Sequence, residues 1–361
     1  MKVLFNLPSI HQYSAIFEML KHLAGKLDSL TVITQDNSPI DKSEIPANLH
    51  ILALPGAKSK FLKGIMFQSS FAQHDIIHDT FGYLLPLGVL TKLSKSKYIT
   101  SGWGCSASWY YKAKEIGFGD QNELDLHRRL MAREHLNTIF CDAILVNSPS
   151  FSKDYVELYG YSKSKIHHIP EPVITNNNLQ FTSRSEGAFN MLYVGHISKM
   201  KGIHILLNAF AKLVEEGHDA KLTVIGKYIP HDRKIIEQCS WKNVDFLEPM
   251  EQNELAKYFQ KMDLYVHPSY QEGMPRVVME ALSHGVPVVA SDLPGIRTIE
   301  GSENLIKFME TFDPNELKNI LCNEMKCHRK DADYFRRARA RMMNFSPDII
   351  AEKVFKVYES L

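Results

Sequence analysis

The sequence predicts an α/β fold with two doubly wound domains, and three observations lead to this prediction. Short β-rich runs alternate with longer helix-like stretches along nearly the whole chain, which is the pattern of parallel sheets with crossover helices. The length of 361 residues exceeds what one hydrophobic core usually holds together. A polar segment with Pro and Asn residues interrupts the alternation from Glu171 to Gly187, and such segments separate domains.

The first predicted domain spans residues 1–172. Amphipathic stretches at residues 10–23 and 122–140 predict helices between its strands. The candidate strands are the β-rich runs at residues 2–6, 30–34, 50–54, 75–78, 98–101 and 143–147.

The second predicted domain spans residues 173–345. Its candidate strands lie at residues 189–194, 221–225, 244–247, 264–266 and 287–290, and its candidate helices at 201–216, 252–261 and 275–284. Because doubly wound sheets bind ligands at the carboxyl ends of their strands, we expect the active site in the cleft between the two domains. The last segment, residues 346–361, contains an amphipathic helix with no following strand, so this helix must dock on another element.

Composition excludes several classes of protein. Lys plus Arg number 42 against 41 Asp plus Glu, so no global charge attracts nucleic acid as the main partner. No apolar run reaches the 18 or more residues of a membrane span, and the opening run is too short for a signal peptide. The 5 cysteines form no C-x-x-C pair. We therefore expect free thiols and a cytoplasmic protein.

The segment from His267 to Asp292 carries the strongest functional pattern. A strand ends near Val266, a loop holds Glu272, and a helix starts at Pro275, a residue suited to the first helical position. A helix N-terminus directs N–H groups at anions. Glu272 and Glu280, 8 residues apart, offer carboxylates that accept hydrogen bonds from hydroxyl groups. The segment predicts a site for an anionic or hydroxyl-rich ligand.

Two motifs resemble those of the retaining glycosyltransferases of family 4, which have the GT-B fold. The first joins Glu272 and Glu280 to the segments 285–287, Gly-Val-Pro, and 291–295, Ser-Asp-Leu-Pro-Gly. The second, residues 193–202, resembles the family's strand, Gly-Arg turn and Lys-Gly helix start, where a basic pair grips the donor diphosphate. The resemblance covers residues 189–300 and extends to the final helix, which in this fold crosses back to the N-terminal domain.

The resemblance implies transfer of a hexose-type sugar, with retention, from a UDP- or GDP-sugar to a glycan or glycolipid acceptor in surface polysaccharide biosynthesis. It implies no cofactor and no metal. Lys201 and Glu272 would be catalytic: Lys201 would neutralise the diphosphate, Glu272 would hold the transferred sugar, and Glu280 would hold the ribose. The implied donor-binding set is Gly195, His196, Lys201, Phe246, Leu247, Glu272, Gly273, Met274, Pro275, Arg276 and Glu280.

The chain departs from the family pattern at position 196, where His replaces Arg. A short, usually neutral imidazole stands in place of a bidentate guanidinium. Diphosphate binding is then weaker or is helped by another group. Arg276 is the first candidate for that group, and a surface ion pair is the alternative for it.

Acceptor-side candidates are His78 and an aromatic cluster. Trp103, Trp109 and Tyr110 follow a first-domain strand and either stack on an acceptor sugar or pack under a loop. His78 lies at a strand end, where it either faces the cleft or forms structural hydrogen bonds. Residues 58–67 mix cations with large apolar groups. This region either contacts the inner face of a membrane carrying a lipid-linked acceptor or packs as a helix on its own sheet.

Other functions are compatible with this architecture. The altered position 196 is also expected of a GT-B binding or regulatory subunit without turnover. A nucleotide-sugar epimerase is a further alternative. Asp331 and Asp333 resemble a metal-binding Asp-x-Asp, but they lie in a charged helical stretch and are interpreted as a solvated face.

Overall fold

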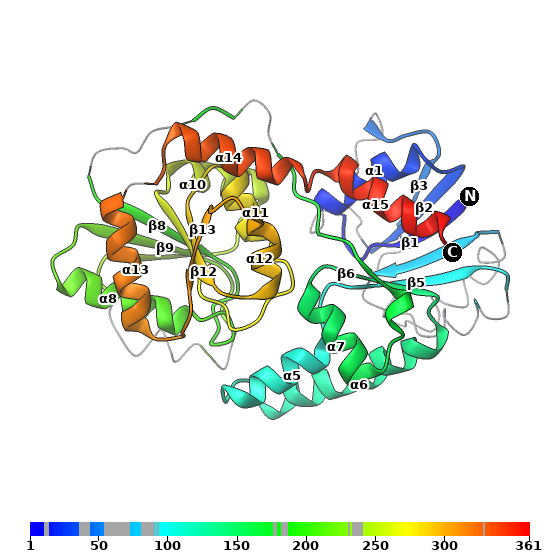
Figure 1. Cartoon of the computed structure of the whole chain (residues 1–361), viewed down its shortest axis with the longest axis horizontal. Coiled ribbons are helices and arrows are strands. Elements are labelled where there is room, and N and C mark those ends of the chain that lie inside the picture. The colour runs from blue at the N-terminus through cyan, green and yellow to red at the C-terminus, as the bar shows by residue number, and fades with distance from the viewer. Residues whose placement is uncertain are drawn as a thin grey trace. The chain divides into compact units, whose positions relative to one another are not determined.

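The computed structural model describes residues 1–10, 14–35, 44–53, 73–80, 91, 94–175, 179–181, 187–229, 232, 241–327 and 329–361. The chain forms two compact units, coloured along the sequence in Figure 1. Unit 1 consists of Met1–Tyr110, Leu124–Pro172 and Phe345–Leu361, and unit 2 of Tyr111–Glu123 and Val173–Asn344. Residues 58–67, the candidate membrane contact, lie outside the described residues.

Unit 1 is built on a seven-stranded parallel sheet in the order β3-β2-β1-β4-β5-β6-β7. The order reverses direction between β1 and β4, as expected for a doubly wound sheet. The strands are β1 Lys2–Asn6, β2 Ser29–Thr34, β3 Leu49–Ala53, β4 Ile76–Thr80, β5 Lys97–Gly102, β6 Ala143–Val146 and β7 Ile166–His168. Among the described residues, its helices are α1 Ser14–Ala24, α7 Pro149–Tyr159 and α15 Pro347–Glu359. Two further helices, α5 Ser106–Glu115 and α6 Gln121–Phe140, start or end in unit 1 and share residues 111–123 with unit 2.

The C-terminal helix α15 completes the core of unit 1. Its buried face packs on α1 and joins the same hydrophobic cluster, and an ion pair of 2.5 Å links Lys26 Nζ to Glu352 Oε2. Tyr358, near the end of α15, is 2% exposed. The last helix therefore docks on the N-terminal unit. The chain leaves that unit after Pro172 and returns to it at Phe345.

Unit 2 is built on a six-stranded parallel sheet in the order β10-β9-β8-β11-β12-β13. The strands are β8 Phe189–Val194, β9 Ala220–Ile225, β10 Val244–Leu247, β11 Leu264–His267, β12 Val288–Ser291 and β13 Ile306–Met309. The helices are α8 Ile203–Glu215, α10 Gln252–Lys261, α11 Arg276–Ser283, α12 Pro294–Glu300, α13 Pro314–Cys327 and α14 Ala332–Met343. Helix α8 packs on α13, and α11 packs on α14.

The α/β class with two parallel sheets is confirmed, with corrections at particular boundaries. Strand β13 was not predicted, because its short run contains Lys307 among apolar residues. Pro275 is the N-cap of α11 and not its first helical residue. Helix α8 begins at Ile203, so Lys201 precedes it in the loop, and Gly202 occupies the N-cap.

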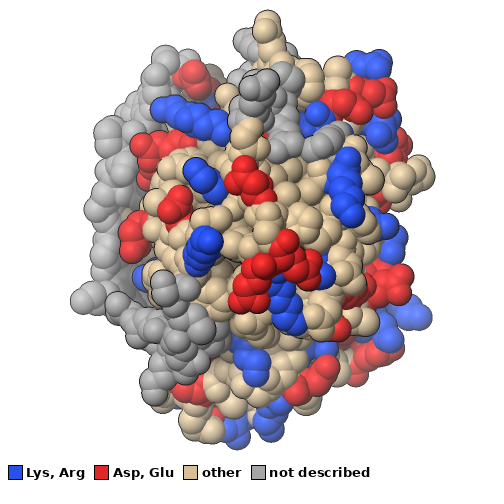
Figure 2. All heavy atoms as spheres, turned by 90° about the vertical axis from the view of Figure 1, so that its left-hand side faces the viewer, with Lys and Arg blue, Asp and Glu red and all other residues tan. Residues whose placement is uncertain are grey.

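The charged side chains are mixed in sign. On the face that Figure 2 shows, Lys and Arg lie beside Asp and Glu without a broad area of one sign among the described residues. This distribution agrees with the net charge of +1. None of the described helices combines the length and the apolar character that crossing a membrane requires.

Candidate active site

The residues singled out by the sequence motifs lie at the carboxyl edge of the unit 2 sheet. Strands β8 and β11 are parallel neighbours, with Leu192 opposite Tyr265. The loop after β8, residues 195–202, and the loop after β11, residues 268–275, therefore leave the sheet at the same edge. The strand order reverses between β8 and β11, so both loops lie at the topological switch point, where doubly wound sheets bind ligands.

Glycine allows the two loops to touch. Gly202 has a φ of 69°, and a Cβ at this position would lie 1.9 Å from the carbonyl oxygen of Pro268. The Tyr270 N–H donates to the Met200 carbonyl at 3.0 Å. Because the backbones approach so closely, side chains from the two loops can meet.

Lys201 and Glu272 meet across these loops. Lys201 Nζ lies 2.7 Å from Glu272 Oε1, and His267 Nε2 lies 2.8 Å from the same oxygen. The Glu272 side chain is 11% exposed. Burial alone would raise the pKa of Glu272, but the charge of Lys201 and the hydrogen bond from His267 hold that pKa well below its usual range. Glu272 is therefore a carboxylate, with Oε1 occupied by two donors.

His267 is held in turn by Tyr265, on the same strand. The Tyr265 hydroxyl lies 3.0 Å from His267 Nδ1 and 3.2 Å from the Val194 carbonyl oxygen. Burial raises the pKa of Tyr265 well above its usual value, so the hydroxyl keeps its proton. His267 is thus held at both ring nitrogens, Nδ1 by the Tyr265 hydroxyl and Nε2 by the Glu272 carboxylate, and these two contacts fix the orientation of the imidazole.

The sequence interpretation missed this role of Tyr265 and His267. His267 opened the motif that was recognised, but a histidine ending a buried strand is indistinguishable from a packing residue until its partners are known. The alternation of Tyr265 and His267 on β11 was the available signal, since residues two apart on a strand share one face.

Glu280 lies on α11 and is joined to the start of α10. Gln252 Nε2 donates to Glu280 Oε1 at 3.1 Å. Helix α10 follows the loop after β10, where Phe246 and Leu247 end the strand. Phe246 is partly buried and packs near Tyr228, with ring centroids 6.4 Å apart. The structure therefore connects Glu280 to the helix that follows the donor-set residues Phe246 and Leu247.

Two lysines from different loops, Lys201 and Lys227, act on His196. His196 reaches solvent, yet partial desolvation of its ring lowers its pKa, and the nearby charges of Lys201 and Lys227 lower it further. The imidazole is therefore neutral at pH 7. Lys227, which follows β9, was not among the predicted site residues.

The remaining donor-set residues lie in or beside the same two loops. Gly195 adopts a φ of 154° after β8, and a Cβ on neighbouring Gly226 would lie 1.8 Å from the Gly195 carbonyl oxygen. Gly273, Met274 and Pro275 are buried in the loop before α11, while Arg276, its first residue, is partly exposed.

His78, one of the acceptor candidates, forms buried hydrogen bonds in unit 1. It is 1% exposed, its Nδ1 lies 2.6 Å from the Tyr358 hydroxyl, and its Nε2 lies 2.7 Å from Ser101 Oγ. Burial lowers its pKa to about 3. Both ring nitrogens are occupied inside unit 1, so His78 attaches α15 to the sheet.

The aromatic candidates are partly exposed and also packed. Trp109 stacks on His127 at a centroid distance of 3.7 Å, and Trp103 packs against the hydrophobic core of unit 1. Tyr110 is partly exposed. These contacts are those of loop and helix packing, and they leave part of each ring accessible.

The Asp-x-Asp of α14 serves local structure, as interpreted. The Asp331 carboxylate accepts from the Tyr334 N–H at 2.7 Å and caps the helix. Asp333 pairs with Arg336 at 2.8 Å and with Arg337 at 2.9 Å. Both carboxylates are accounted for by these contacts.

Comparison with known proteins identifies the family. Residues 175–338 match the model of the glycosyl transferases group 1. A D-inositol 3-phosphate glycosyltransferase of Nocardioides sp. is 22% identical over 97% of this chain and 78% of its own length. A protein of the same name from Streptosporangium roseum is 21% identical, and the match spans 74% of this chain and 66% of that protein.

Solved structures show the same fold over the full chain. Sucrose-phosphate synthase from Thermosynechococcus elongatus superposes with a TM-score of 0.78 at 18% identity, covering 100% of this chain and 98% of that one. HepE of Anabaena in complex with UDP-glucose superposes with a TM-score of 0.76 at 18% identity, covering 100% of both chains. Residues 175–338, which contain both motifs up to Gly295, match the glycosyl transferases group 1, and the whole chain has the GT-B fold that the two motifs predicted.

Proposed function

We propose that the protein is a retaining glycosyltransferase that moves a hexose-type sugar from a UDP- or GDP-sugar to a glycan or glycolipid acceptor. The observation that carries this proposal is the pairing of Lys201 with a buried, ionised Glu272 at the switch point of unit 2. The ammonium group can bind the diphosphate of a donor, and the carboxylate beside it can accept hydrogen bonds from the sugar hydroxyls.

Donor binding begins with an exchange of partners at Lys201. An incoming diphosphate offers the ammonium more negative charge than one carboxylate, so Lys201 turns towards the phosphate oxygens. Glu272 stays in place because His267 still donates to Oε1. Oε2 then accepts from a hydroxyl of the donor sugar. Glu280 holds the ribose, beside the segment after β10 that receives the base.

Transfer breaks the bond between the anomeric carbon and the diphosphate oxygen. Negative charge grows on the leaving diphosphate, and Lys201 stabilises that charge more in the transition state than in the ground state. The acceptor hydroxyl attacks the same face of the sugar, and its proton passes to the leaving phosphate oxygen. Retention follows without a protein nucleophile.

The nucleotide-sugar donor is supported by the relatives. The HepE structure of the same fold is a complex with UDP-glucose, and the matched family model covers the unit that holds Lys201 and Glu272. The acceptor proposal, a glycan or lipid-linked sugar in surface polysaccharide biosynthesis, rests on family resemblance. The proposed cytoplasmic location rests on the cysteine pattern, and the proposed peripheral contact with the inner face of a membrane rests on the mixed cationic and apolar composition of residues 58–67.

A thermal-shift screen against UDP- and GDP-sugars tests the donor class, since a ligand that binds only the folded state raises the melting temperature. We expect one nucleotide series to stabilise the protein and to be consumed in the presence of acceptor, with EDTA leaving the rate unchanged. Loss of transfer with EDTA and its return with manganese would refute metal independence. If a nucleotide sugar raised the melting temperature but was neither hydrolysed nor transferred, the result would favour the alternative of a binding or regulatory subunit, which His196 also fits.

A further inference from the structure

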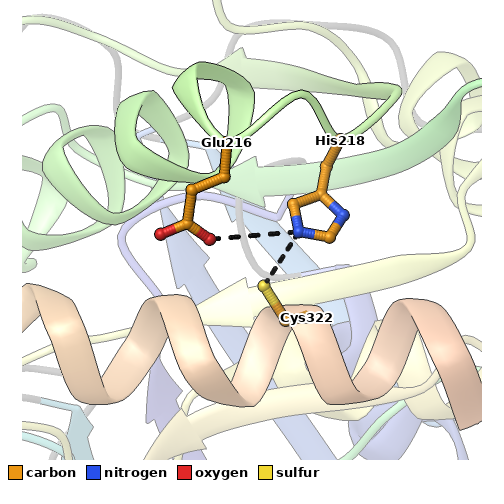
Figure 3. A group of neighbouring side chains, drawn as sticks. All are labelled: Glu216, His218 and Cys322. Carbon is orange, nitrogen blue, oxygen red and sulfur yellow. Dashed lines mark hydrogen bonds and ion pairs between the residues drawn. The ribbon is translucent and has the colours of Figure 1, made fainter.

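A second group of chemically active side chains lies in unit 2, apart from the proposed donor site. Figure 3 shows Glu216 and His218, at the end of α8, facing Cys322 on α13. Helix α8 starts from the loop after β8 and leads to the first residue of β9. Its last turn therefore lies at the amino edge of the parallel sheet, opposite the carboxyl edge that holds Lys201 and Glu272.

The three ligand atoms lie close to the spacing of a tetrahedral metal site. His218 Nε2 lies 3.5 Å from Cys322 Sγ and 4.0 Å from Glu216 Oε2, and all three atoms lie within 4.8 Å of one another. Around tetrahedral zinc, with bonds of about 2.0–2.3 Å, neighbouring ligand atoms are roughly 3.4–3.6 Å apart. Small side-chain rotations would bring the set to this geometry.

The backbone holds these side chains in place before any ion binds. Gly217 adopts a φ of 88°, its N–H donates to the Val214 carbonyl at 3.0 Å, and the His218 N–H donates to the Leu213 carbonyl at 3.2 Å. These bonds close the end of α8 and fix the positions of Glu216 and His218. Cys322 is fixed by the packing of α13 on α8.

The donor set is the one that zinc prefers. A thiolate, an imidazole and a carboxylate are the three protein ligand types of zinc, and three of them leave the fourth position to water. Lys318 Nζ lies 2.7 Å from Glu216 Oε1, which leaves Oε2, the oxygen nearest His218, for the ion. The positive charge of Lys318 opposes the ion, so it limits the affinity without blocking the site.

We propose that Glu216, His218 and Cys322 bind a zinc ion that clamps the end of α8 to α13. The Cys322 thiol releases its proton to solvent as the Zn–S bond forms. The ion lies at the edge of the sheet opposite the proposed reaction site, so its effect is on the stability of unit 2 and not on sugar transfer.

Zinc titration of the full chain, followed by calorimetry and thermal unfolding, tests this site. We expect one zinc ion per chain and a higher melting temperature. Cys322→Ser and His218→Gln each alter a direct ligand and should weaken zinc binding by at least about 10-fold. Replacing a residue that only supports a metal ligand already costs that much affinity. Cobalt should give a thiolate-to-metal absorption band that only Cys322→Ser abolishes.

Two matched variants serve as controls. Cys327→Ser removes an exposed thiol from the same helix, outside the group, and should leave binding unchanged. Lys318→Gln removes the opposing charge and should tighten binding. Zinc binding that Cys322→Ser leaves unchanged, or that Cys327→Ser abolishes, would refute the site. So would the absence of stabilisation at excess zinc. These readouts do not involve transfer, so they are independent of the proposed function.

Discussion

Lys201 Nζ and Glu272 Oε1 lie 2.7 Å apart although their residues are separated by 71 positions in the chain. The contact exists because Gly202 lets the loop after β8 approach Pro268 at the start of the loop after β11. An anionic ligand must take Lys201 from Glu272, so the two side chains should respond differently to substitution.

Replacing Lys201 with Ala should reduce turnover strongly, by about 2 to 4 kcal/mol of transition-state stabilisation, because it removes the charged contact to the leaving diphosphate. Donor binding should weaken as well. Steady-state kinetics with a proven donor and acceptor measure both effects. The control is Lys212→Ala on α8, whose ammonium instead donates to Asn315; it should transfer at the parent rate. If Lys201→Ala transferred sugar at the rate of the parent protein, the assignment of the donor site would be wrong.

Replacing Glu272 with Gln should impair use of the donor sugar while leaving affinity for the free nucleoside diphosphate nearly intact. The proposed contact of Glu272 is to a sugar hydroxyl through Oε2. In Gln the one acceptor oxygen stays with the donors at the Oε1 position, so the sugar hydroxyl loses its acceptor. Calorimetry with the nucleoside diphosphate and with the nucleotide sugar separates the two affinities. Glu280→Gln, assigned to the ribose, should weaken both ligands alike. Equal losses for both ligands in Glu272→Gln would contradict the division of roles.

The sequence predicted this site as far as local patterns allow. The strand-loop-helix pattern around Glu272 and the Lys201-Gly202 turn are local, and family motifs mark them. The hydrogen bonds from Tyr265 through His267 to Glu272 depend on side-chain directions at the end of β11, which composition does not reveal. The hydrogen bond between His78 and Tyr358 joins residues 280 positions apart, so no local pattern indicates it. The approach of Cys322 to His218 depends on how α13 docks on α8 and has no local signal.

Tyr265 and His267 should act as positioning residues for Glu272. His267→Ala removes the Nε2–H donor and should lower kcat about 10-fold or more, whereas His267→Gln retains an N–H that reaches the carboxylate and should recover much of the rate. Tyr265→Phe should give an intermediate loss, since the imidazole loses one of its partners. A purely structural role predicts that the Ala and Gln variants differ only in melting temperature, with the same kcat once folded.

His196→Arg should tighten donor binding, because a guanidinium adds a charge-assisted, bidentate contact to the diphosphate where a neutral imidazole now stands. Titration with the nucleotide sugar and the nucleoside diphosphate should show the gain for both. An unchanged affinity would mean that Lys227 or Arg276 already completes the site. Arg276→Gln and a substitution at Lys227 would then identify which cation does so.

The buried His78 should make unit 1 sensitive to acid. Burial lowers its pKa from 6.5 to about 3, so the folded state keeps the ring neutral while the unfolded state binds a proton below about pH 6.5. The unfolded state then holds more protons, and the free energy of unfolding should fall as the pH drops from about 6.5 towards 3. His127 of unit 1 acts in the same direction because burial lowers its pKa to about 4, and His204, whose pKa is also lowered to about 4, has this effect on unit 2.

Two variants isolate the contribution of His78. Tyr358→Phe removes the hydroxyl 2.6 Å from His78 Nδ1 and should lower the free energy of unfolding at pH 7 by about 1 to 3 kcal/mol, the usual cost of leaving a buried polar atom without a partner. His78→Gln cannot titrate, so its stability should fall less between pH 7 and pH 5 than that of the parent. Urea denaturation at both pH values measures the difference, with His22→Gln, an exposed histidine, as the control. If His78→Gln lost as much stability on acidification as the parent, the acid sensitivity would have to arise from other groups, and His78 would serve only to attach α15 to the sheet.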